Sequence, residues 1–203
     1  GATPLVVMVN PRLVPATDLA GLLAWARAQR APPGYGSSGA GSVHHIFGEA
    51  LRARTGVGLT HVPYRGSAPM LADLLGGAIP IGFDTLPQNI EHIRDGRLRA
   101  IVVTAPARQP MAPEVPTIAE AGFPGLEAEN WLGLSGPAGI PPAIVARLHA
   151  ETTAALDTPL LRSRMEEHGI SGRPMSSAEF TAFVAEQVRT VGGAVRALGI
   201  TAG

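Results

Sequence analysis

Predicted strands and helices alternate at short spacing over residues 5–104, and this alternation restricts the fold more than any other feature of the sequence. Short apolar segments are followed by segments in which apolar residues recur every three or four positions. The predicted strands span residues 5–9, 35–38, 59–62, 79–83 and 98–104. Such alternation is typical of a parallel α/β sheet with helices on both faces.

Residues 137–203 break this pattern, because they predict three amphipathic helices and almost no strand. The helices are expected at 142–156 and 159–168 and, after a Ser176–Glu179 capping box, through Leu198. An apolar helix stripe needs a covering surface, and the sheet predicted above already has helices of its own. The tail is therefore expected to pack against a sheet that this sequence does not contain, or against a second copy of the chain.

The composition is that of a folded globular chain, and it excludes several partners. Of the 203 residues, 45% are hydrophobic, and 16 basic residues balance 16 acidic ones without forming a basic stripe. Nucleic acid is therefore not expected as a partner. The absence of cysteine excludes disulfides and thiolate zinc sites. Adjacent helical residues such as His44 and His45 point in different directions and cannot chelate together, so no metal or cofactor is expected.

A glycine-rich loop joins the second predicted strand to the helix that follows it. Glycine lets backbone N–H groups approach a ligand closely, and a helix N-terminus adds unpaired N–H donors and a partial positive charge. Because the loop has no lysine or arginine, it is expected to hold a carboxylate or other small anion through N–H and hydroxyl groups. The candidate ligand-binding residues are Ser37, Ser38, Gly39, Ala40, Gly41 and Ser42, with His45 supporting the loop from behind.

Nucleotide-binding interpretations of this loop fit the sequence less well. A G-x-G-x-x-G motif runs from Gly34 to Gly39, but two prolines precede it and no acidic residue ends the next strand. The loop also lacks the lysine of a P-loop. A plain strand-to-helix turn stays open as a structural explanation.

A small-acid hydrolase is a further alternative, with Ser38 or Ser42 as the nucleophile. The loop misses the G-x-S-x-G motif by one position, because Ala40 replaces the last glycine. His45 and Asp84 are the candidates for the histidine and the acid that such an enzyme needs.

Two more polar loops follow predicted strands and are expected at the same edge of the sheet. Tyr64 comes after the third strand, and Asp84 and Thr85 come after the fourth. In open α/β sheets, ligands bind beyond the carboxyl ends of the strands. Polar loops from three strands therefore predict a cleft, in which Tyr64 forms a wall and the Asp84–Thr85 pair contacts the far side of the ligand.

A set of short motifs follows a fixed order and spacing along essentially the whole chain. These motifs are Tyr35–Ser42 with His45, His61–Pro69, Asp73–Gly77, Phe83–Pro87, Gly96–Ala100, Glu114–Gly122 and Trp131–Gly133. In these motifs the sequence resembles the Bug-type (TctC-type) periplasmic solute-binding receptors of tripartite tricarboxylate transporters.

The resemblance implies a fold like that of type II periplasmic binding proteins, in which two α/β lobes enclose the ligand. It implies that residues 1–10 form an inter-lobe crossing strand, that 11–128 form the second lobe with its ligand loops, and that 129–203 form a crossing strand and the helical remainder of the first lobe. It further implies a periplasmic, non-enzymatic receptor that delivers a small carboxylate to the membrane components of a transporter.

The resemblance also implies a difference in length. Family members carry about a hundred further residues at the N-terminus, and these hold most of the first lobe's sheet. Ligand capture by this chain is therefore expected to be impaired, and the exposed C-terminal helices are expected to favour a homo-oligomer. A truncated chain that self-associates without binding any solute is the remaining alternative.

Overall fold

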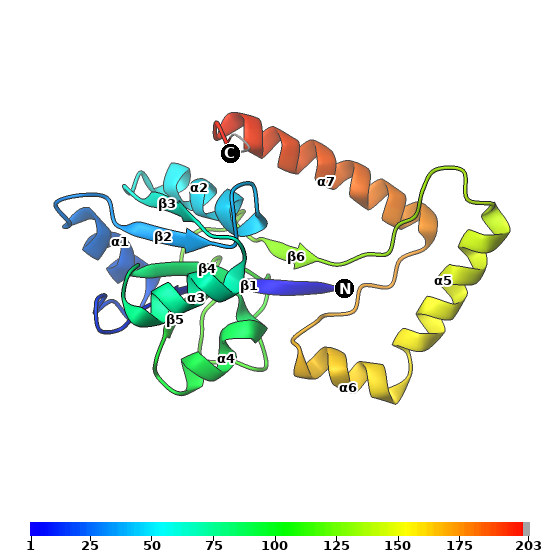
Figure 1. The fold of residues 1–203 in the computed structure, drawn as a ribbon, viewed down its shortest axis with the longest axis horizontal. Helices are drawn as coiled ribbons and strands as arrows, with labels where there is room; N and C mark the ends of the chain where they lie inside the picture. Colours follow the sequence, from blue (N-terminus) through cyan, green and yellow to red (C-terminus); the bar gives the residue numbers. More distant parts are fainter. Residues whose placement is uncertain (201–203) are drawn as a thin grey trace.

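The computed structural model describes residues 1–200 and contains one sheet with helices on both sides, from which three further helices extend (Figure 1). The strands are β1 (Ala2–Val9), β2 (Gly34–Ser37), β3 (Thr60–Pro63), β4 (Ile81–Thr85), β5 (Arg99–Val103) and β6 (Glu129–Trp131). The helices are α1 (Leu19–Arg27), α2 (Val43–Thr55), α3 (Ser67–Gly76), α4 (Leu86–Arg94), α5 (Pro142–Leu156), α6 (Pro159–Glu167) and α7 (Ser177–Ala197). The predicted α/β class, with a sheet that is mostly parallel, is confirmed.

The sheet has the order β3-β2-β4-β1-β5, and β1 is the strand that departs from the parallel arrangement expected over residues 5–104. β2 is parallel to β3 and to β4, whereas β1 is antiparallel to both β4 and β5. The reason lies in the connection that follows β1. After Asn10 the chain turns through α1 and enters β2 from the same edge at which β1 ended, so β1 runs opposite to its neighbours.

The side chains of β1 alternate between two apolar cores, which explains why every residue of this strand is buried. Leu5, Val7 and Val9 pack with residues of α1 and α2. Val6 and Met8 pack on the other face with residues of α3 and α4. The helices thus cover both faces of the sheet, as predicted, and β1 contributes side chains to both cores.

The first residues of β1 extend beyond the sheet and form a two-stranded ribbon with β6. Ala2 pairs with Trp131, and Pro4 pairs with Glu129. The crossing strand implied for the start of the segment 129–203 is short, because the chain beyond Trp131 is not a strand. Trp131 instead packs its ring edge-on against Phe180 and Phe183 of α7, at centroid distances of 6.1 and 5.4 Å.

Helices α5, α6 and α7 form at the predicted positions but have no buried residues. Figure 1 shows α5 and α6 extending away from the sheet, while α7 returns towards α2. Large apolar side chains on these helices are exposed, namely Ile144, Leu148, Leu156, Leu160, Val188 and Val191. Their apolar stripes therefore lack the covering surface that such stripes need. No helix within residues 1–200 is both long enough and apolar enough to cross a membrane.

Candidate ligand-binding site

The loops that follow β2, β3 and β4 meet at one edge of the sheet, as the sequence predicted. The Tyr64 N–H donates to the Ser37 carbonyl at 3.2 Å, and the Gly66 N–H donates to the Ser38 carbonyl at 3.1 Å. Ser67 Oγ, at the start of α3, donates to Asp84 Oδ1 at 2.8 Å. These hydrogen bonds link the three loops to one another.

The glycine loop ends in a capped helix whose first N–H groups are free. Ser42 is the N-cap of α2, and its Oγ accepts from the His45 N–H at 3.2 Å. Gly39 and Gly41 have φ angles of 146° and 74°, which side-chain-bearing residues rarely adopt. Within residues 1–200, the N–H groups of Ala40, Val43 and His44 have no hydrogen-bond partner. The loop thus offers unpaired donors beside a helix dipole, which is the arrangement that binds small anions.

The serine hydroxyls of the loop are all engaged within the protein. Ser37 is fully buried, and its Oγ lies 2.7 Å from His61 Nε2. Ser42 Oγ donates to the Gly39 carbonyl at 2.7 Å in addition to capping α2. Backbone N–H groups are therefore the donors that the loop leaves available for a ligand.

A pair of stacked imidazoles contacts the loop. The rings of His45 and His61 are 3.6 Å apart between centroids and inclined by only 7°. The Gly41 N–H donates to His45 Nδ1 at 3.1 Å. Burial lowers the pKa of His45, and burial together with the neighbouring His45 lowers the pKa of His61 to about 4. Both rings are consequently neutral near pH 7.

Asp84 lies beneath the loops as a buried hydrogen-bond acceptor with only 1% of its surface exposed. Apart from Ser67, it accepts from the Thr85 N–H at 2.9 Å and from Asn89 Nδ2 at 3.3 Å. Thr85 is also buried, and its Oγ1 has no hydrogen-bond partner within residues 1–200. The contact of this pair with a ligand stays a prediction.

His44 lies between Ser38 and Asp84, an arrangement that the sequence analysis did not predict, although within residues 1–200 its Nε2 makes no hydrogen bond. Ser38 Oγ lies 2.7 Å from His44 Nδ1, and the opposite ring nitrogen of His44 lies 3.6 Å from Asp84 Oδ1. Burial lowers the pKa of His44, while the Asp84 carboxylate opposes this effect. The histidine between the serine and the acid is thus His44, whereas His45 had been the candidate.

Tyr64 is half-buried beside the glycine loop, and its hydroxyl donates to Asp73 Oδ2 at 2.8 Å. Burial and this hydrogen bond raise the pKa of Tyr64 to about 12. Its carbonyl oxygen lies so close to Gly39 that a Cβ there would be 3.2 Å away. Tyr64 therefore lies beside the glycine loop, and its role as a wall of the site stays a prediction.

Several residues around these loops were not identified from the sequence, namely His44, His61, Ser67 and Asn89. His61 had one available signal, since it lies in the strand that precedes the Tyr64 loop. Its partners depend on the parallel register that pairs Tyr35 with His61, and this register is a tertiary feature. Within residues 1–200, no three histidine, aspartate or glutamate side chains come together as metal ligands would.

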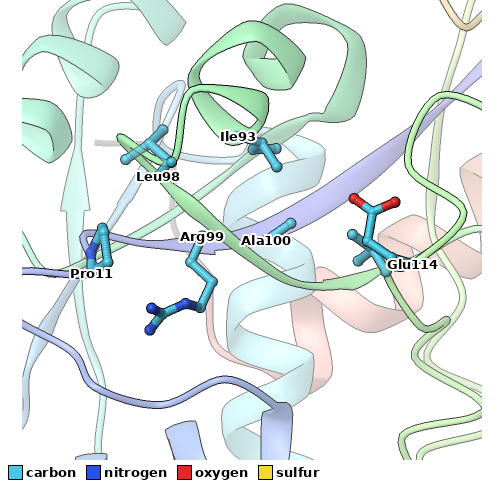
Figure 2. Close-up of a pocket in the computed structure, with 8 residues that line it drawn as sticks. Pro11, Ile93, Leu98, Arg99, Ala100 and Glu114 are labelled. Atoms are coloured by element: carbon cyan, nitrogen blue, oxygen red, sulfur yellow. The ribbon is translucent and has the colours of Figure 1, made fainter.

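The opposite edge of the sheet contains two separate hollows. One, of about 260 Å³, is lined by residues that include Pro11, Arg99 and Glu114 (Figure 2). The Arg99 guanidinium donates to the carbonyls of Pro15 and Ala16 and is already occupied. The other, of about 680 Å³, lies near Trp25 and Gly34. Both are remote from the three loops, because they lie where β1 ends and where the parallel strands begin.

Comparison with known proteins gives a consistent family match. The family model described as "Tripartite tricarboxylate transporter family receptor" matches residues 2–200. Protein BugT of Bordetella pertussis is 31% identical over 199 residues, which cover 98% of this chain and 61% of BugT. The match spans about half to three-fifths of the length of three of the curated relatives, BugT among them.

Solved structures agree with this match. The R. palustris protein Rpa4515, determined with adipate, superposes with a TM-score of 0.90 and 33% identity, over all of this chain and 67% of that one. MatC from Rhodopseudomonas palustris, determined with bound malate, gives a TM-score of 0.84 and 29% identity over 96% of this chain and 67% of its own.

Proposed function

Because this chain belongs to the tripartite tricarboxylate transporter receptor family, we propose that it captures a small carboxylate in the periplasm and presents it to the membrane components of such a transporter. The observation that carries this proposal is the set of free N–H groups of Ala40, Val43 and His44 beside the two neighbouring loops. Adipate and malate, named with two structural neighbours, are both dicarboxylates. A small dicarboxylate is therefore the favoured class of ligand.

In this proposal the backbone of residues 37–42 surrounds one ligand carboxylate, and Tyr64 forms a side wall. The Asp84–Thr85 pair forms the floor, with the unpaired Thr85 Oγ1 as the group available to the ligand. His45 acts behind the loop. The helix dipole and charge-assisted hydrogen bonds from N–H groups then replace the lysine or arginine that an anion site often contains.

The proposed division of the chain follows the expected lobes. Residues 1–10 cross between lobes, 11–128 form the ligand-loop lobe, and 129–203 form a return crossing and the helices of the other lobe. The β1–β6 ribbon supports this division, because β1 pairs with β6 through its first residues and enters the main sheet only from Leu5 onward. In the whole receptor, the ligand would be enclosed by hinge closure of two lobes.

A thermal-shift panel of mono-, di- and tricarboxylates tests the proposed function. We expect one or more dicarboxylates to raise the melting temperature, since a ligand at a hundred times its Kd stabilises the folded state by about 2.7 kcal/mol. The corresponding neutral diamides serve as matched controls and should produce no shift. A panel without any carboxylate-dependent shift would contradict capture of a carboxylate by this chain.

A serine hydrolase is the second candidate function, and the Ser38–His44–Asp84 arrangement is the observation that favours it. His44 is placed to accept the Ser38 proton, while Asp84 faces the other ring nitrogen. If this arrangement is catalytic, a fluorophosphonate probe should label the protein and Ser38→Ala should abolish labelling. Ser42→Ala is the control, because the Ser42 hydroxyl bonds the backbone of Gly39 and His45 and not a histidine ring. Absence of labelling would contradict the hydrolase and leave the receptor as the one candidate function.

The exposed apolar side chains of α5, α6 and α7 lead us to propose that this chain also forms a homo-oligomer. Burial of these stripes against a second copy would remove apolar surface from water. We expect light scattering to give a mass above 20.9 kDa, and Leu148→Glu with Val188→Glu to shift the mass towards that of a monomer. A monomeric mass for the unmodified chain would contradict this association.

A further inference from the structure

The stacked His45–His61 pair makes hydrogen bonds to both ends of the glycine loop. His61 Nε2 bonds Ser37 Oγ at 2.7 Å, where the loop begins. His45 Nδ1 accepts from the Gly41 N–H at 3.1 Å, just before α2 starts. Ser37 Oγ also accepts from the Gly39 N–H at 3.2 Å. The two imidazoles thus hold the loop in the shape that leaves its remaining N–H groups free.

The bond from Gly41 can form only when His45 is neutral. An imidazolium carries a proton on each nitrogen, so His45 Nδ1 would lose its lone pair and oppose the Gly41 donor. Two imidazolium rings 3.6 Å apart would in addition repel each other. Protonation therefore weakens this support in two ways, at the hydrogen bond and at the ring stack.

We propose that His45 and His61 are a positioning pair that keeps the loop competent for carboxylate binding only while both rings are neutral, so that acid releases the ligand. This inference rests on the proposed function, in which the loop binds the carboxylate. The rings do not contact the ligand and act through the backbone of the loop. Acid sensitivity would then be a property of the loop itself, separate from protonation of the ligand.

The surroundings of the pair set the direction of its response. Glu49 on α2 favours the charged form of both rings, but burial opposes it more strongly. Tyr35 on β2 lies 5.1 Å from His61 between ring centroids and donates its hydroxyl to Glu49 at 2.8 Å. His44 is the adjacent residue on α2 and bonds Ser38 instead. Of the groups within residues 1–200, Glu49 and the partner imidazole are those that act on the pKa of His61 together with burial.

The lowered pKa of each ring determines how the stability of the closed loop changes with pH. His61 has a pKa of about 4 in the folded protein, compared with about 6.5 for an unperturbed histidine. The histidines therefore bind protons more readily when the loop is open or unfolded than when it is closed. The closed loop is favoured fully above pH ~6.5. This preference is lost as the pH falls from about 6.5 towards about 4.

Hydrogen–deuterium exchange of the ligand-free chain tests the inference at pH about 7 and about 4.5, after correction for the intrinsic pH dependence of exchange. We expect the segment 37–45 to exchange severalfold faster at the lower pH, while the β1 segment stays protected. His45→Asn is the conservative variant, because its side-chain oxygen can accept from Gly41 without titrating. Since His61 still titrates in this variant, its loop should show a clearly smaller acid-induced rise in exchange than the unmodified chain. His45→Phe keeps an aromatic ring but no acceptor, and its loop should exchange fast at both.

Equal corrected exchange of segment 37–45 at both pH values would overturn the inference. Acid sensitivity as large in His45→Asn as in the unmodified chain would do the same, and so would β1 opening in parallel with the loop. These measurements need no ligand, so they are independent of the carboxylate panel that tests the proposed function. If the panel identifies a ligand, its affinity should fall with acid in the unmodified chain and fall less in His45→Asn.

Discussion

Replacement of Val43 by proline is expected to weaken carboxylate binding about ten- to a hundredfold without disturbing the fold. Val43 is the first residue of α2, where proline is well tolerated. Ser42 has φ −65° and ψ 159°, a conformation that suits a residue before proline. The substitution removes one of the free N–H donors, and a hydrogen bond to a charged group contributes about 1.5–3 kcal/mol. Isothermal titration with the carboxylate that the panel identifies measures the loss.

The matched control for this experiment is Val43→Ala, which shortens the side chain but keeps the N–H donor. It should bind with nearly unchanged affinity. Proline and alanine variants with the same affinity would show that the Val43 N–H does not contact the ligand. Circular dichroism of the proline variant should show an unchanged helix content, because this N–H has no partner within residues 1–200.

Replacement of Asp84 by alanine is expected to lower the free energy of unfolding by roughly 3 kcal/mol or more, even without ligand. The carboxylate accepts from Ser67, Thr85 and Asn89 in a site with only 1% exposure. Each buried donor that loses its acceptor costs about 1–3 kcal/mol. At about 2–4 °C per kcal/mol for a chain of this length, the melting temperature should fall by roughly 6–12 °C.

Asp95→Ala is the control, since Asp95 is exposed and forms a surface ion pair with Arg97. Surface pairs contribute little to stability, so its melting temperature should stay within about 2 °C of the unmodified value. If Asp84→Ala melts normally but no longer binds carboxylates, Asp84 is a ligand group and not a structural support of the loops.

The local sequence was sufficient to predict much of the α/β architecture and the place of the candidate site. Strands predicted to end at residues 38, 62 and 83 end at Ser37, Pro63 and Thr85 in the structure, because polar or glycine-rich loops follow them. Parallel neighbours bring such ends to one edge, and the hydrogen bond from the Tyr64 N–H to the Ser37 carbonyl confirms that two of these loops meet. The free N–H groups of the loop also follow from local features, since glycines precede a capped helix.

The direction of β1 and the histidine contacts were decided only by the tertiary structure. β1 has the apolar pattern of any buried strand, and this pattern is the same whether the strand runs parallel or antiparallel to its neighbours. His61 reaches Ser37, 24 residues away in the sequence, through the register of β2 and β3. Neighbouring His44 and His45 separate into two networks because successive helical residues point in different directions.

The sequence by itself therefore determined the elements, their apolar faces and the loop that offers backbone donors, because these depend on contacts between residues close together in the chain. The tertiary structure decided which side chains support that loop: His61 behind Ser37, His45 behind Gly41, and Asp84 beneath Ser67. Strand register and helix packing set these pairings, and they are fixed only when distant segments fold against one another.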